Sequence, residues 1–182
     1  FLFKASNDGV LEWINIYDTD TQGNSLKQTF DGGYAILGFI YSDYETDMYL
    51  VKTDPAGSVE WTKTFSDSAG FSMLQTADGG YVLAGVKIDP ADEHTDFYMI
   101  KTNDDGTVDW SKTYGTTDLE CVYALVATSD GGYAMAGKAY SMSTCSRSAL
   151  LKTDASGNLQ WSEFYEFTED NAACSMIQAS DG

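Results

Sequence analysis

Hydrophobic and polar positions along the chain form short strand-like runs and show no helical period. Between positions 71 and 114 the runs read FSMLQTA, GYVLAGV, DFYMIKT and TVDWSKTY, with turn residues such as Asp-Gly-Gly and Asn-Asp-Asp-Gly between them. The second and third runs are almost continuously apolar, as in strands that are buried on both faces. The fourth alternates, as in a strand with one wetter face. This pattern predicts an all-β protein with four short strands per unit.

The unit recurs about every 49 residues. Segments KASNDGVLEW, KTDPAGSVEW, KTNDDGTVDW and KTDASGNLQW align without gaps on a tryptophan (Trp13, Trp61, Trp110, Trp161) and a turn glycine (Gly9, Gly57, Gly106, Gly157). A second motif, DGGYAILG, DGGYVLAG and DGGYAMAG, places its second glycine at Gly33, Gly80 and Gly132, and the chain ends in a truncated Asp-Gly. Four short strands, one Trp and glycine turns per unit are typical of a β-propeller blade.

The fold prediction is therefore a β-propeller of four-stranded antiparallel blades, with an incomplete ring. The whole chain, 1–182, is one propeller segment. It holds the last two strands of a first blade (1–17), three complete blades (25–65, 71–114 and 121–165) and the first strand of a next blade (172–182). Because open sheet edges pair readily with other strands, either the remaining blades of a longer chain or further copies of this chain should cover the two ends.

The pattern DGGYxxxG followed by KTDxxGxVxWxKTY resembles the PQQ-like β-propeller repeats of bacterial and archaeal secreted and cell-surface proteins. The resemblance covers essentially the whole chain and implies a propeller with an extracellular or cell-surface location. The family's Tyr-Gly-Gly-Ser-x-Asp-Asp loop survives only as Tyr114, Gly115 and Asp118. PQQ itself is not predicted, because its binding needs a complete ring with a basic, aromatic pocket, and Arg147 is the single arginine. Fold resemblance carries little weight for function.

Charge excludes one class of partner. The chain has 28 acidic and 10 basic residues, a formal net charge of −18, so a phosphate backbone is repelled and nucleic acid is not a predicted partner. No apolar run reaches the length of a membrane helix, and no membrane span is predicted.

Strand direction divides the loops between two faces. The turns joining first to second and third to fourth strands are uniform and rich in glycine, and we call their side the turn face. The other loops vary in length and content, and we call their side the variable face, where ligands usually bind. Its acidic residues are Asp18, Asp20, Asp43, Glu45, Asp47, Asp67, Asp89, Asp92, Glu93, Asp96, Asp118, Glu120, Glu166, Glu169 and Asp170.

Two sites on the variable face remain open between alternatives. Asp18, Asp20 and Gln22 resemble the start of a calcium loop, but Thr29 stands where the bidentate acid belongs, so the alternative is an Asx-type turn. Cys145 could form a disulfide with Cys121 or with Cys174, the alternative being isolated thiols.

No catalytic site is predicted. His94 is the only histidine and reads as a surface residue, so a Ser-His-Asp or multi-histidine metal site has no basis. Asp47 and Asp96 occupy matching positions, which favours a role in blade geometry over glycoside hydrolysis, and Arg147 stands at the third such position. The lysines at matching positions (Lys4, Lys52, Lys101 and Lys152) are interpreted as partners of turn acids.

The sequence favours a non-catalytic binding, adhesion or scaffold propeller that takes a protein or carbohydrate ligand on its variable face. One alternative is a structural subunit that assembles through open blade edges. Another is a fragment of a larger propeller enzyme. Apart from calcium, no cofactor is predicted.

Overall fold

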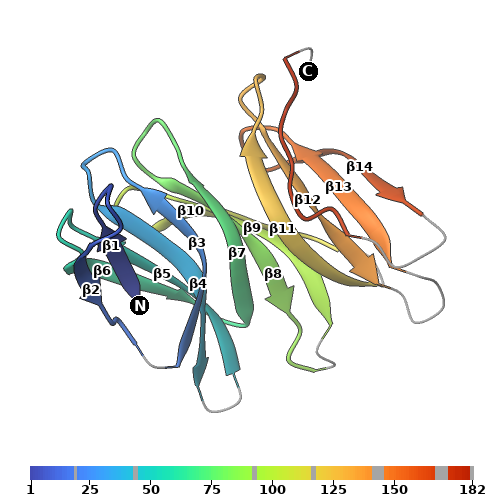
Figure 1. Cartoon of the computed structure of the whole chain (residues 1–182). Helices are drawn as coiled ribbons and strands as arrows, with labels where there is room; N and C mark the ends of the chain where they lie inside the picture. The colour runs from blue at the N-terminus through green and yellow to red at the C-terminus, as the bar shows by residue number, and fades with distance from the viewer. Residues whose placement is uncertain are drawn as a thin grey trace.

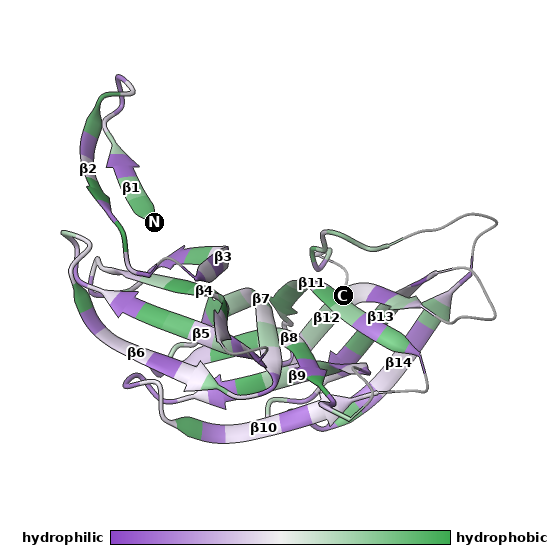
Figure 2. Ribbon diagram, turned by 90° about the horizontal axis from the view of Figure 1, so that it is seen from below, coloured by the Kyte–Doolittle hydropathy of each residue, from purple (hydrophilic) through white to green (hydrophobic). Residues whose placement is uncertain are grey.

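The computed structural model describes residues 1–18, 20–42, 45–91, 94–115, 118–140, 146–166 and 172–180. These residues form fourteen strands in four antiparallel sheets and contain no helix. The all-β prediction is confirmed. The four sheets follow one another in chain order and form no closed ring among the described residues (Figures 1 and 2).

Each complete sheet is a meander whose strands pair in sequence order. The first sheet has two strands, β1 (Leu2–Ala5) and β2 (Leu11–Asn15). The second sheet contains β3 (Thr21–Gln28), β4 (Tyr34–Ser42), β5 (Glu45–Thr53) and β6 (Val59–Phe65). The third contains β7 (Ser68–Gln75), β8 (Tyr81–Ile88), β9 (Thr95–Thr102) and β10 (Val108–Tyr114). The fourth contains β11 (Leu119–Ala127), β12 (Tyr133–Tyr140), β13 (Arg147–Thr153) and β14 (Leu159–Tyr165).

The first strand of each complete sheet begins earlier than the sequence predicted. β3 starts at Thr21 instead of position 25, β7 at Ser68 instead of 71, and β11 at Leu119 instead of 121. Each of these strands has a register shift within its first six residues, where one extra residue interrupts the pairing. Polar and glycine residues around such a bulge break the alternation, so the start of the strand reads as a loop.

Burial follows the predicted pattern across each sheet. In the third sheet, β8 is buried on both faces from Tyr81 to Val86, whereas β10 alternates between partly buried and exposed residues. The first strands are the innermost, because β7 contacts β3 on one side and β11 on the other. The last strands β6 and β10 lie at the outer margin and carry more polar residues (Figure 2).

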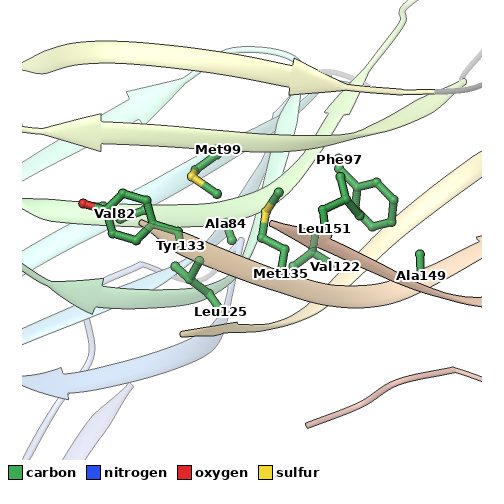
Figure 3. Packing of buried hydrophobic residues seen from close by; sticks show 10 residues of the cluster. All are labelled: Val82, Ala84, Phe97, Met99, Val122, Leu125, Tyr133, Met135, Ala149 and Leu151. Carbon is green, nitrogen blue, oxygen red and sulfur yellow. The ribbon is translucent and has the colours of Figure 1, made fainter. Parts of the chain in front are cut away.

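Hydrophobic cores fill the space between successive sheets. Figure 3 shows the core between the third and fourth sheets, where Phe97 and Met99 of β9 face Met135 and Leu151. The full set is Val82, Ala84, Phe97, Met99, Val122, Leu125, Tyr133, Met135, Ala149 and Leu151. The second core joins the second and third sheets through Ala35, Leu37, Met48, Leu50, Met73, Tyr81, Leu83 and Ile100. Burial of these side chains, with each Val, Leu, Ile, Phe or Met contributing on the order of 1.5–3 kcal/mol, is the main source of cohesion between sheets.

A tryptophan and a glycine join each pair of neighbouring sheets, an arrangement we call the Trp–Gly joint. Trp61 of β6 lies against the turn of the next sheet, where a Cβ on Gly106 would be 2.8 Å from its ring. Trp61 also makes an edge-on contact with Tyr81 at a centroid distance of 6.0 Å. The same joint recurs as Trp13 with Gly57 and Tyr34, and as Trp110 with Gly157 and Tyr133.

The last tryptophan, Trp161, and the first turn glycine, Gly9, take part in no Trp–Gly joint within the described residues. Trp161 is 45% exposed, and a Cβ on Gly9 would meet no atom within 4 Å. The contact surfaces that pair in the interior are therefore open at the two ends of the sheet series.

Residues 172–180, expected to be the first strand of a next blade, form no strand. The segment nevertheless lies against the fourth sheet, because Gln178 accepts a hydrogen bond from the Ser129 N–H at 2.7 Å and donates to the Ser129 hydroxyl at 3.1 Å. Gln75, at the end of the first strand of the third sheet, accepts an equivalent hydrogen bond from the Phe30 N–H of the second sheet at 3.0 Å. The segment thus occupies the position of a first strand, but a strand assignment requires a hydrogen-bonded ladder, and no neighbouring strand forms one with it.

Candidate binding face

Lysine–aspartate pairs hold the turn face together. Lys101 has a side chain that is 9% exposed and donates to both oxygens of Asp78 at 3.2 and 3.0 Å and to the Thr102 carbonyl at 2.8 Å. Gly80 leaves room for this contact, because a Cβ there would lie 2.1 Å from the Thr102 carbonyl oxygen. Lys52 with Asp31 and Lys152 with Asp130 repeat the arrangement. The interpretation as partners of turn acids is confirmed for these three lysines, whereas Lys4 pairs with Glu12 of strand β2 at 2.7 Å instead.

These pairs make stability sensitive to acid. The Thr76 hydroxyl and the Lys101 ammonium lower the pKa of Asp78 from 3.8 to about 2, and the Lys52 ammonium, with the Thr29 hydroxyl, does the same for Asp31. A carboxyl whose pKa is lower in the folded state stabilises the fold above the unfolded-state pKa, and that stability is lost as the pH falls toward the folded-state pKa. We expect the thermal midpoint to fall between about pH 4 and pH 2. Circular dichroism melts should show a smaller fall for Asp78→Asn, and an equal fall would contradict this assignment.

The variable face is built differently in each sheet. In the second sheet, Asp47 accepts a hydrogen bond from the Asp67 N–H at 2.9 Å and supports a backbone in the left-handed region, with φ of 50° at Asp67. In the fourth sheet, Arg147 takes the matching position, binds Asp118 and lies 3.8 Å from Glu166. Equivalent positions of the repeat therefore carry different chemistry on this face.

Two acids that the sequence suggested as exposed loop residues of the variable face are buried. Asp118 is 9% exposed and paired with Arg147, and Glu120 is 2% exposed at the start of β11. The exposed acids on the described part of this face include Asp18, Asp20, Glu45 and Glu166. Five of the acids assigned to this face (Asp43, Asp92, Glu93, Glu169 and Asp170) lie outside the described residues.

One group of potential ligands converges on the variable face between the third and fourth sheets. His94, just before β9, places its Nε2 atom 3.5 Å from Asp96 Oδ1. One ligand atom each from His94, Asp96 and Glu120 lies within 4.8 Å of the other two. Among the described residues this is the single group of three or more His, Cys, Asp or Glu side chains with such geometry. From the sequence, His94 reads as a surface residue, and the group cannot be recognised there because Glu120 is distant along the chain and lies in a stretch that reads as a loop.

The calcium candidate contains local backbone contacts. Asp18 Oδ1 accepts from the Asp20 N–H at 3.3 Å, as in an Asx-type turn, and the Gln22 amide donates to Asn24 at 3.1 Å. Calcium binding there stays a prediction.

The cysteine prediction also stays untested. Cys145 lies outside the described residues. Cys121 is partly buried and Cys174 exposed, and the two form no disulfide with each other. Burial raises the pKa of the Cys121 thiol, which keeps it protonated and unreactive near neutral pH.

No protein-family model and no curated protein sequence matches this chain. The described residues include no helix with the length and apolarity to cross a membrane.

Proposed function

We propose that this chain is part of an extracellular or cell-surface β-propeller that binds a ligand on its variable face and is not an enzyme. The observation that carries the proposal is the contrast between the two faces. The turn face repeats one set of structural contacts in three sheets, whereas matching positions on the variable face carry Asp47, Asp96 and Arg147 with three different sets of partners. A constant scaffold with individually varied loops is the usual arrangement of a binding module.

The charge of the variable face indicates the chemistry of the ligand. Exposed carboxylates such as Asp20, Glu45 and Glu166 lie there, and their summed field attracts cations and speeds their encounter. We therefore propose a protein or carbohydrate ligand with positively charged groups.

Charge neutralisation on one face at a time tests this function. The probes are an octalysine peptide and a chitosan oligosaccharide, titrated by calorimetry at low and high salt. The double variant Asp20→Asn/Glu45→Gln removes two exposed charges from the variable face, and Asp8→Asn/Asp104→Asn removes two from the turn face as the control. We expect the first pair to weaken binding about threefold to tenfold and the control pair to have a smaller effect. Equal weakening by both pairs would show attraction by net charge alone and contradict a binding face.

A structural subunit that assembles through its open sheet edges is a second candidate. It is favoured by the 45% exposure of Trp161 and the empty space at Gly9, since these are the two halves of the Trp–Gly joint. Under this alternative, light scattering should find species larger than the 19.9 kDa chain, and Trp161→Ser should reduce their size.

A further inference from the structure

We propose that His94, Asp96 and Glu120 bind a divalent transition-metal ion, zinc being the best fit, at the border of the third and fourth sheets. The proposal does not depend on the binding function above, because it concerns an ion held by the fold itself.

The three side chains come from two segments of the chain, residues 94–96 and the start of β11. His94 ends the β8–β9 loop, Asp96 is the second residue of β9, and Glu120 is the second residue of β11 in the next sheet. The distance of 3.5 Å between His94 Nε2 and Asp96 Oδ1 equals the spacing of two ligands on one tetrahedral ion, which is about 3.4 Å for metal–ligand bonds of about 2.0–2.1 Å. All three ligand atoms lie within 4.8 Å of one another, so small side-chain rotations bring them onto a common ion.

Burial and charge favour a cation in this place. Glu120 is 2% exposed, and its carboxylate approaches a second carboxylate, that of Asp96. Two like charges close together in a partly buried place repel, and a divalent cation between them removes the repulsion. The outer side of the site is open, because the side chains of His94 and Asp96 are 26% and 32% exposed, so an ion can enter and water can complete its coordination.

The backbone next to the site is shaped to accept the Asp96 carboxylate. Gly115 follows β10 directly, and a Cβ there would lie 2.0 Å from Asp96 Oδ1. Any other residue would displace that carboxylate. The glycine therefore leaves room for the carboxylate of this ligand, an observation that is independent of the distances among the three side chains.

The positions that match Asp96 in the second and fourth sheets do not form a similar group of ligands. Asp47 of the second sheet is bound to a backbone N–H, and Arg147 of the fourth is bound to Asp118. Only Asp96 has a histidine two residues before it and a buried glutamate across the sheet border.

The ligand set selects the metal. An imidazole nitrogen with two carboxylate oxygens suits zinc and similar ions, whereas calcium prefers oxygen ligands alone. Thr95 Oγ1 already donates to the Glu120 carbonyl at 2.8 Å across the same border. An ion held by β9 and β11 would add a second link between the two sheets and stabilise the folded state by mass action.

The test uses the full chain, stripped with a chelator and titrated with ZnCl₂ by calorimetry and thermal melts. We expect one zinc ion per chain and a higher melting temperature with zinc. His94→Ala, at a partly exposed loop position, should weaken zinc binding by about tenfold or more and remove the thermal shift. Asp47→Asn, the matching acid of the second sheet, is the control and should leave zinc binding unchanged.

Two further measurements keep the result unambiguous. Cobalt in place of zinc should give a visible spectrum without a thiolate charge-transfer band, which separates this site from the sulfur atoms of Cys121 and Cys174. Calcium should bind more weakly than zinc. Absence of stoichiometric zinc binding, equal binding by His94→Ala, or a thiolate band in the cobalt spectrum would overturn the proposal.

Discussion

Gly106→Ala is expected to lower the free energy of unfolding by about 2–5 kcal/mol, with two separable causes. Gly106 has a φ of 77°, and a residue with a Cβ costs about 1–2 kcal/mol in this left-handed region. The added methyl group would also lie 2.8 Å from the Trp61 ring and 2.7 Å from Lys63 Cγ, and overpacking of this kind costs about 1–3 kcal/mol. Urea denaturation followed by tryptophan fluorescence measures the loss.

Gly131→Ala is the matched control, because Gly131 has a φ of 86° but a Cβ there would meet no atom within 4 Å. Gly131→Ala should lose only the free energy of unfolding that comes from the left-handed backbone, about 1–2 kcal/mol. If both variants lose the same stability, the Trp–Gly joint contributes no packing constraint, and the account of how neighbouring sheets are joined is wrong.

Lys101→Met should lower the free energy of unfolding by about 2–3 kcal/mol. Removing one member of a fully buried ion pair costs about 3–5 kcal/mol, and the expected loss is smaller because the Asp78 side chain is 63% exposed. Methionine fills much of the same space but removes the donors to Asp78 and to the Thr102 carbonyl. The measurement is the urea midpoint of the variant against the parent protein.

Lys87→Met provides the comparison within the same sheet. Lys87 also faces an aspartate, Asp67, at 3.5 Å, but its side chain is 36% exposed, and surface pairs contribute little. Its midpoint should change much less than that of Lys101→Met. Similar losses in the two variants would mean that burial of Lys101 does not decide its role.

The regular part of the fold could be predicted from the sequence. Continuous apolar runs at β8 and β9 and alternation at β10 mark buried and outer strands, and the repeated Asp-Gly-Gly and Lys-Thr-Asp motifs mark the turns between them. These signals are local, because each one can be read from a short run of residues within one strand or one turn.

The variable face could be predicted only in part, because its contacts cross sheets and depend on loop paths. Nothing near Glu120 in the sequence signals that its carboxylate is buried beside His94, and a run of polar residues there reads as an exposed loop. The early start of β3 was hidden for a similar reason, since a bulge interrupts the alternation that reveals a strand. One difference between the repeats on this face is visible in the sequence, because Arg147 stands at a position that is aspartate in two other repeats.

The Trp–Gly joint bears on how a chain of this kind can change in length. Trp61 comes from one repeat and Gly106 from the next. Each repeat therefore supplies a tryptophan that packs on the turn of the following repeat and a glycine turn that receives the tryptophan of the preceding one. Duplication or deletion of one whole unit therefore preserves every remaining joint, since stability in such arrays depends on each unit and its nearest neighbours. A gain or loss of part of a unit would leave one ring without its turn, so whole-repeat steps are the tolerated changes in size.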